Sequence, residues 1–166
     1  MIMRKLAFLS DVNIDMLQPI LKKSDEYELY FSAFNQWQSD LMNPDSSLHH
    51  FVPDVVFLFL LNDDIKYDFE NDIKVPVDFF CKLHTKSKIF ISDYFEKPYS
   101  VSSFISTGEK DAVLSKLIQY VAEEHQIELF RFSRLIQLYG HLQMFDDKFW
   151  YLGKIKLSQS AKFPKL

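Results

Sequence analysis

The segment Pro53–Leu61 (PDVVFLFLL) is apolar at every position after Asp54. A strand with one face in water alternates apolar and polar residues, whereas a strand buried on both faces is apolar throughout. The segment therefore predicts a strand inside a parallel sheet that has helices on both sides. Four further apolar runs predict the remaining strands: Lys5–Leu9, Tyr27–Phe31, Lys88–Ser92 and Ile127–Phe130.

Amphipathic segments between these strands predict the covering helices. Apolar residues recur at helical spacing after the first strand, where Asp11 or Asn13 is placed to cap the helix. The same spacing predicts a helix between Glu109 and Glu124 and a later one that ends at Gly140. The alternation of strands and helices indicates a three-layer α/β domain with a mainly parallel five-stranded sheet.

The segment 62–78 interrupts this alternation. It is acidic, has no clear period and contains Pro76, so we expect loop and irregular helix there. No repeat, low-complexity tract or linker divides the chain, and 166 residues is the length of one ordinary domain. We therefore expect residues 1–166 to form a single domain.

Composition excludes several classes of function. The net charge of −4 gives no basic field for nucleic acid or anionic lipid, so neither a nucleic acid nor a membrane is an expected partner. Three glycines argue against a glycine-rich phosphate loop. The single cysteine and the short apolar stretch before Asp11 favour a cytoplasmic protein. We expect no cofactor and no metal.

Small polar residues follow four of the predicted strands. Ligands of open α/β sheets bind beyond the carboxyl ends of the strands, so these positions are where a site is expected. The same residue types also cap helices and form turns, and position alone favours neither role. The four sets are Ser10–Asp11, Ser32–Asn35, Asn62–Asp64 and Ser92–Asp93.

Several segments together resemble the N-terminal domain of the FkbH-like proteins. In that family a flavodoxin-like or SGNH-hydrolase-like domain precedes a HAD-type phosphatase-fold domain. The resemblance rests on KLAFLSDVNIDMLQPIL, YFSAFNQWQSDLMNPDSSLHHFVPDVVFLFL, KIFISDYFEKP and MFDDKFWYLGKIKLS, which occur in family order over nearly the whole chain. It implies a biosynthetic context in which the HAD domain loads a glyceryl group from a bisphosphorylated glycerate onto an acyl carrier protein.

The loading chemistry belongs to the HAD domain, which uses an aspartate nucleophile in a strand-end Asp-x-Asp motif. Asn62-Asp63-Asp64 follows a strand but lacks that spacing, so the activity is not transferred to this chain. We expect an auxiliary or docking domain that is not catalytic alone, with a HAD-type catalytic domain or subunit and an acyl carrier protein as partners. Asp11, Trp150 and Tyr151 are the residues expected to contact substrate or partner.

The alternative is a degenerate SGNH-type serine hydrolase or acyltransferase. Ser10 stands near the place of that superfamily's nucleophile, and Asn35 and Asn62 are candidate oxyanion donors. SGNH enzymes supply the base from a C-terminal Asp-x-x-His pair, but this chain has Trp150 at the position of the histidine. Indole has no basic nitrogen, so His141 or another histidine would have to serve. A small-molecule-binding flavodoxin-like module is a third, weaker hypothesis.

The other histidines favour structural roles. His49 and His50 are adjacent and point in different directions, which makes them a poor metal pair. His84 and His125 lie in amphipathic segments and are expected on helix surfaces. The carboxylates of Asn62–Asp64 suit Mg²⁺, but we favour a capping role for this cluster.

Overall fold

A computed structural model of the chain describes residues 3–62, 64–93, 109–140 and 144. Its centre is a five-stranded sheet in the order β2-β1-β3-β4-β5, in which every neighbouring pair is parallel. The strands are β1 (Arg4–Ser10), β2 (Tyr27–Phe31), β3 (Val55–Phe59), β4 (Lys88–Ser92) and β5 (Ile127–Phe130). The predicted α/β class and parallel sheet are confirmed, and the strand order reverses between β1 and β3.

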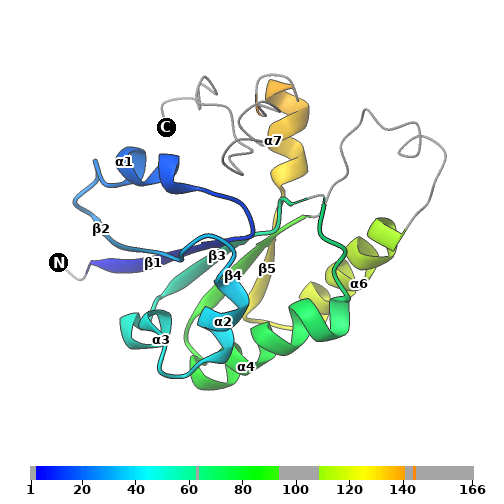
Figure 1. Ribbon diagram of the computed structural model, residues 1–166, viewed down its shortest axis with the longest axis horizontal. Helices are drawn as coiled ribbons and strands as arrows, with labels where there is room; N and C mark the ends of the chain where they lie inside the picture. Colours follow the sequence, from blue (N-terminus) through cyan, green and yellow to red (C-terminus); the bar gives the residue numbers. More distant parts are fainter. Residues whose placement is uncertain (1–2, 63, 94–108, 141–143, 145–166) are drawn as a thin grey trace.

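Helices lie on both sides of the sheet (Figure 1). On one side are α2 (Trp37–Met42), α3 (Ser47–Phe51), α4 (Val75–Leu83) and α6 (Glu109–Glu123). On the other side are α1 (Gln18–Leu21), which continues the 3₁₀ turn η1 (Asp15–Leu17), and α7 (Phe132–Tyr139). None of the helices in the described part of the chain is both long and apolar enough to cross a membrane.

Helix α4 corrects the expectation for the segment 62–78. A π-helical turn, η2 (Phe69–Lys74), precedes it, as irregular helix was expected, but regular α-helix begins at Val75. Pro76 lies in the first turn of α4, a position where helices tolerate proline. Asp68 caps the π-helical turn by accepting hydrogen bonds from the N–H groups of Glu70 and Asn71.

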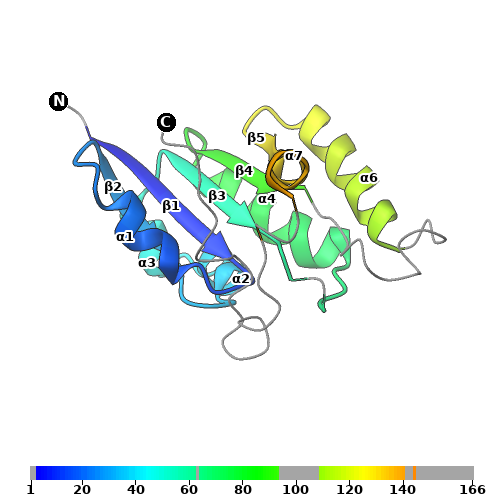
Figure 2. The same cartoon turned by 90° about the horizontal axis from the view of Figure 1, so that it is seen from above.

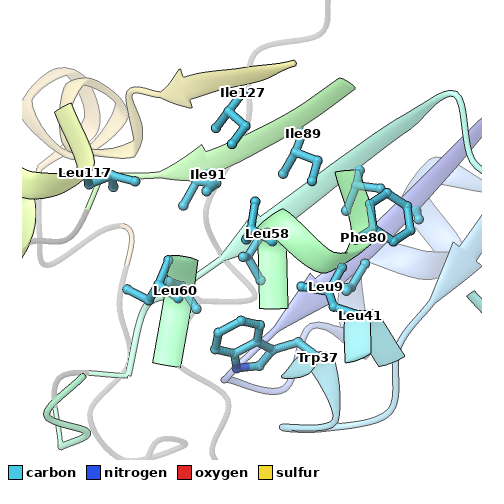
Figure 3. Close-up of a cluster of buried hydrophobic side chains, with 14 of the residues drawn as sticks. Leu9, Trp37, Leu41, Leu58, Leu60, Phe80, Ile89, Ile91, Leu117 and Ile127 are labelled. Atoms are coloured by element: carbon cyan, nitrogen blue, oxygen red, sulfur yellow. The ribbon is translucent and has the colours of Figure 1, made fainter. Parts of the chain in front are cut away.

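The larger core lies between the sheet and helices α2, α3, α4 and α6, and we call this side the helix-covered face. Val56 and Leu58 of β3 point to this face and are fully buried. Figure 3 shows strand residues meeting Trp37 and Leu41 of α2 and Phe80 of α4. The labelled residues of this core are Leu9, Trp37, Leu41, Leu58, Leu60, Phe80, Ile89, Ile91, Leu117 and Ile127.

The smaller core lies on the opposite side, which we call the phenylalanine face. Phe8, Val12 and Phe132 are buried there, together with Ile14, Leu61 and Met144. Phe57 and Phe59 of β3 point to this face and are only partly buried. The described residues therefore bury β3 fully on one face only, whereas its uniformly apolar sequence predicted burial on both.

Candidate functional site

Ser10 ends β1 at the carboxyl edge of the sheet and is 3% exposed. Its hydroxyl donates a hydrogen bond to the Phe59 carbonyl oxygen at 3.0 Å, and its Oγ accepts one from the Val12 N–H at 3.1 Å. A serine nucleophile needs its proton directed to a base. In this structure the proton of Ser10 is directed to a main-chain carbonyl of the neighbouring strand.

Asp11 is fully buried and binds the turn that follows β3. Its carboxylate accepts hydrogen bonds from the N–H groups of Leu61, at 2.7 Å, and Asn62, at 3.1 and 3.2 Å to the two oxygens. The Tyr67 hydroxyl donates a further bond at 2.9 Å. A buried carboxylate is stable only when such donors replace its lost hydration. Asp11 therefore holds the segment after β3 against the end of β1.

Asn62 belongs to the same network, whereas Asn35 lies in a separate turn. Asn62 is 7% exposed, and its side-chain oxygen accepts a hydrogen bond from the Asp64 N–H at 3.0 Å. That contact is an Asx turn, the capping role favoured for this cluster. Asn35 is exposed between β2 and α2 with φ of +54°, a conformation that asparagine tolerates better than most residues. The structure thus joins Ser10, Asp11 and Asn62 through hydrogen bonds to the β3 end.

The polar residues after β2 and β4 also link neighbouring segments. The Ser92 Oγ accepts a hydrogen bond from the Leu60 N–H at 2.8 Å. The buried Asp93 carboxylate accepts hydrogen bonds from the N–H of Ser133, at 2.8 Å, and from the Ser133 hydroxyl, and so fixes the start of α7. The Ser32 N–H donates to the Phe8 carbonyl oxygen at 2.9 Å. Asp93 thus has the helix-capping role that was one of the two expected, whereas the bonds of Ser92 and Ser32 join the ends of neighbouring strands.

The histidines of the described residues lie at the opposite edge of the sheet from Ser10. His49 and His50 are in α3, which leads into β3, and His84 and His125 shortly precede β4 and β5. Each is therefore close to the amino end of a strand, whereas Ser10 is at a carboxyl end. Hydrolysis by Ser10 would need a base from elsewhere, and His141 lies outside the described residues, as do Trp150 and Tyr151.

His49 and His84 form a hydrogen-bonded pair that the sequence analysis missed. The His49 Nε2 lies 2.9 Å from the Leu41 carbonyl oxygen, and its Nδ1 lies 2.8 Å from the His84 Nε2. Because a carbonyl oxygen only accepts, His49 carries its proton on Nε2 and its Nδ1 accepts from His84. Burial first, and then the proximity of His49, lower the pKa of His84. His84 is therefore not a helix-surface residue as expected, whereas His50 and His125 are exposed.

Neither cysteine nor metal chemistry is favoured in the described part of the chain. Burial, followed by the charges of Asp78 and Glu124, raises the pKa of the Cys81 thiol to about 12. The thiolate is the reactive form, so this cysteine is a poor nucleophile at neutral pH. No three histidine, cysteine, aspartate or glutamate side chains gather as metal ligands among the residues that the structure describes.

Tyr67 is the other site residue that sequence reasoning missed. It is 56 positions from its partner Asp11, in a segment without periodicity, and its ring meets the Trp37 ring edge-on at 6.0 Å between centroids. No local pattern could have linked Tyr67 to Asp11, because the contact depends on how the segment after β3 folds back. The signal for Asp11 was its place directly after a buried strand.

Comparison with known proteins identifies two solved structures with a similar fold. No family model matches the sequence, and no curated protein matches it. The N-terminal part of a phosphatase-domain protein from Bacteroides fragilis, whose crystal structure contains Mg, aligns with 95% of the chain at a TM-score of 0.74 and 18% identity. A lipase/acylhydrolase from Enterococcus faecalis aligns with 95% of the chain and 88% of its own length, at a TM-score of 0.58 and 13% identity.

The chain spans about half of the Bacteroides protein's crystallised chain, because the alignment covers 48% of it. At identities of 18% and 13% these likenesses establish the fold rather than an activity. The α/β fold of this chain, a parallel sheet in the order β2-β1-β3-β4-β5 flanked by helices, is therefore the fold that it shares with these two proteins.

Proposed function

We propose that this chain is an auxiliary domain that docks with a HAD-type phosphatase-fold unit and is not catalytic alone. The observation that carries the proposal is the alignment of 95% of the chain with about half of a crystallised N-terminal part that is described as containing a phosphatase domain. A domain that occurs beside a catalytic domain in one protein can serve the same partner as a separate subunit or as part of a longer chain.

The contacts of Ser10 and Asp11 support a non-catalytic role. The Ser10 hydroxyl is bonded to the Phe59 carbonyl, and the histidines of the described residues lie at the other edge of the sheet. The Asp11 carboxylate is saturated by main-chain and tyrosine donors. Groups held in this way stabilise loops, whereas a reactive site keeps donors or acceptors available for substrate.

The resemblance to the FkbH-like proteins supplies the finer part of the proposal. It implies that the partner loads a glyceryl or related acyl unit onto an acyl carrier protein. We propose Trp150 and Tyr151 as the contact with these partners, because tryptophan and tyrosine commonly anchor protein interfaces. Asp11 would contribute indirectly, since it is fully buried and fixes the loop after β3.

Reconstitution tests this proposal. The HAD-type polypeptide encoded with this chain, or continuous with it, is purified with and without residues 1–166, and glyceryl transfer to the acyl carrier protein is followed by intact mass. We expect a complex of fixed stoichiometry, and slower loading without the chain. Full loading by the HAD unit alone, with no complex in analytical ultracentrifugation, would overturn the docking role.

A second candidate function is hydrolysis or acyl transfer by Ser10, with Asn35 and Asn62 as oxyanion donors. The likeness to the Enterococcus lipase/acylhydrolase favours it, because that likeness covers 88% of the enzyme. The test is reaction with a fluorophosphonate serine probe, comparing the natural chain with Ser10→Ala by intact mass. We expect no labelling of the folded chain. Labelling that disappears in Ser10→Ala would make the hydrolase the leading function.

A further inference from the structure

The π-helical turn η2 connects the candidate site with α4. It begins two residues after Tyr67, which donates a hydrogen bond to Asp11, and it leads directly into the helix. At its end the Val75 N–H donates to the Glu70 carbonyl oxygen, five residues back, whereas an α-helix would use the carbonyl four residues back. Turns of this kind are rare and are frequently found at functional sites.

Pro76 is the local cause of this turn. In an α-helix the carbonyl group of Asp72 would accept a hydrogen bond from the N–H of residue 76, but proline has no N–H and its ring collides with that carbonyl. A wider π turn relieves the collision. The proline is tolerated in the first turn of α4, but it disfavours α-helical geometry in the turn before it.

Gln38 of α2 supplies the hydrogen-bond donor that the proline lacks. Its side-chain Nε2 donates to the Asp72 carbonyl oxygen at 3.0 Å, across 34 positions of the chain. The neighbouring Trp37 is 1% exposed, and its ring meets the Tyr67 ring edge-on. The first two residues of α2 therefore hold the segment before α4 at two points. Figure 2 shows α2 beside the arrowhead of β1, which is the end of the sheet where the candidate site lies.

The register of the turn decides where the preceding segment points. Successive residues of an α-helix lie about 100° apart around its axis, so an α turn in place of the π turn would rotate the preceding residues by about that angle relative to α4. In the π register Phe69 is 4% exposed in the helix-covered core, with its ring edge-on to Tyr120 at 5.7 Å between centroids. Two residues earlier Tyr67 reaches Asp11, which holds the turn after β3.

We propose that the π-helical turn is a positioning device for the carboxyl edge of the sheet, in which Pro76 selects the π register and Gln38 holds it. Through Tyr67 and Asp11 the device fixes the turn after β3, which contains Asn62. Gln38 and Pro76 are thus positioning residues for the candidate site, although neither belongs to it. The proposal does not rest on the docking function, because any ligand or partner bound at this edge would meet the same turn.

A double substitution tests whether Gln38 replaces the missing donor of Pro76. Gln38→Met keeps the length of the side chain but removes its N–H groups, so we expect the folding equilibrium constant measured in urea to fall roughly fivefold. In Pro76→Ala the main-chain N–H at position 76 can bond the Asp72 carbonyl, and Gln38→Met should then cost less than about twofold. The matched control Gln119→Met, at an exposed glutamine of α6, should cost the same in both backgrounds. An equal effect of Gln38→Met in both backgrounds would overturn the proposal.

NMR of the folded full chain shows whether the device reaches the candidate site. The amide signals of Leu61 and Asn62 report the hydrogen bonds that these groups donate to Asp11. Tyr67→Phe keeps the ring but removes the hydroxyl that bonds Asp11. This variant therefore gives the direction in which the two amide signals move when the tyrosine contact is lost.

We expect Pro76→Ala and Gln38→Met to shift both amide signals in that direction, and Gln119→Met to leave them in place. Circular dichroism establishes that each variant is folded, and Gln38→Met decides alone if Pro76→Ala does not fold. A loss of stability with both amide signals unmoved would mean that the turn does not position the carboxyl edge, and the proposal would fail.

Discussion

On the helix-covered face Val56 and Leu58 of β3 are fully buried, whereas Phe57 and Phe59 of the same strand are only partly buried on the phenylalanine face. The first face uses branched aliphatic residues, which fill the space beneath helices α2, α3, α4 and α6. The second uses flat rings that stack on one another in register. Uniform hydrophobicity of a strand therefore indicates a central position in the sheet, but it does not indicate that the two faces of the strand are equally buried.

A cavity on the helix-covered face should lower the free energy of unfolding more than any other change considered below. Leu58→Ala removes a completely buried side chain from between the sheet and its helices. We expect a loss of about 2–5 kcal/mol in the free energy of unfolding, because the surrounding core can relax only partly. Urea denaturation followed by circular dichroism measures it, and Val75→Ala, at an exposed position, serves as the control. If Leu58→Ala lowers the free energy of unfolding less than Phe57→Leu does, the phenylalanine face contributes more to stability than the helix-covered face.

The second prediction concerns Asp11, whose contacts tie the β1 end to Tyr67 beside Trp37 of the helix-covered face. Asp11→Asn keeps the shape of the side chain but removes its charge. It also places a side-chain NH₂ group, which can only donate, against the main-chain N–H donors that the carboxylate now accepts from. We expect a loss of about 2–3 kcal/mol, since charge-assisted hydrogen bonds are lost and buried N–H groups are left unsatisfied. Urea denaturation measures it, with the exposed Asp45→Asn as control. A loss equal to that of the control would mean that the network is dispensable.

The strands were predictable because each is a short apolar run between polar segments. The bounds of β2 and β4 follow directly from Tyr27–Phe31 and Lys88–Ser92. Helices α2 and α3 were not predicted, because six and five residues are too few to display a helical period. The structure rather than the sequence identifies them, since tertiary packing stabilises such short helices.

The candidate site was predictable in position but not in its contacts. Ser10, Asp11 and Asn62 were singled out because they follow strands, and the hydrogen bonds that join them run through the main chain of the β3 end. The partner of Asp11 is Tyr67, 56 residues away, and the partner of His49 is His84, 35 residues away. Pairs so distant along the chain meet only through the fold, and no spacing rule describes them.

The third prediction probes the phenylalanine face directly. The rings nearest to Phe57 are those of Phe8 and Phe90 on the neighbouring strands, at 5.2 and 5.3 Å between centroids. Phe57→Leu removes these two closest stacked pairs but keeps an apolar side chain. Each aromatic pair contributes about 0.5–1.5 kcal/mol beyond burial, so we expect the loss of two pairs to lower the free energy of unfolding by about 1–3 kcal/mol in urea denaturation. A loss as large as that of Leu58→Ala would show that the two faces are buried equally.

The smallest expected effect is a pH dependence that belongs to the helix-covered face, where His49 of α3 pairs with His84 after α4. The pKa of His84 is lower in the folded chain than its ordinary value of 6.5, so the folded state favours the neutral imidazole. As the pH falls below about 6.5 the unfolded chain binds the proton first, and stability present above that pH is progressively lost. The loss is complete once the pH has passed below the folded pKa.

His84→Gln removes this titration while keeping a side chain that can donate a hydrogen bond to the His49 Nδ1. Urea midpoints between pH 8 and pH 5 should therefore fall less steeply in His84→Gln than in the natural chain. His125→Gln, at an exposed position, should leave the slope unchanged. If the urea midpoint falls equally steeply with pH in His84→Gln and in the natural chain, the loss of stability in acid comes from groups other than this histidine pair. A reduced slope would assign it to the helix-covered face, since His49 lies in α3 and His84 directly follows α4 on that side.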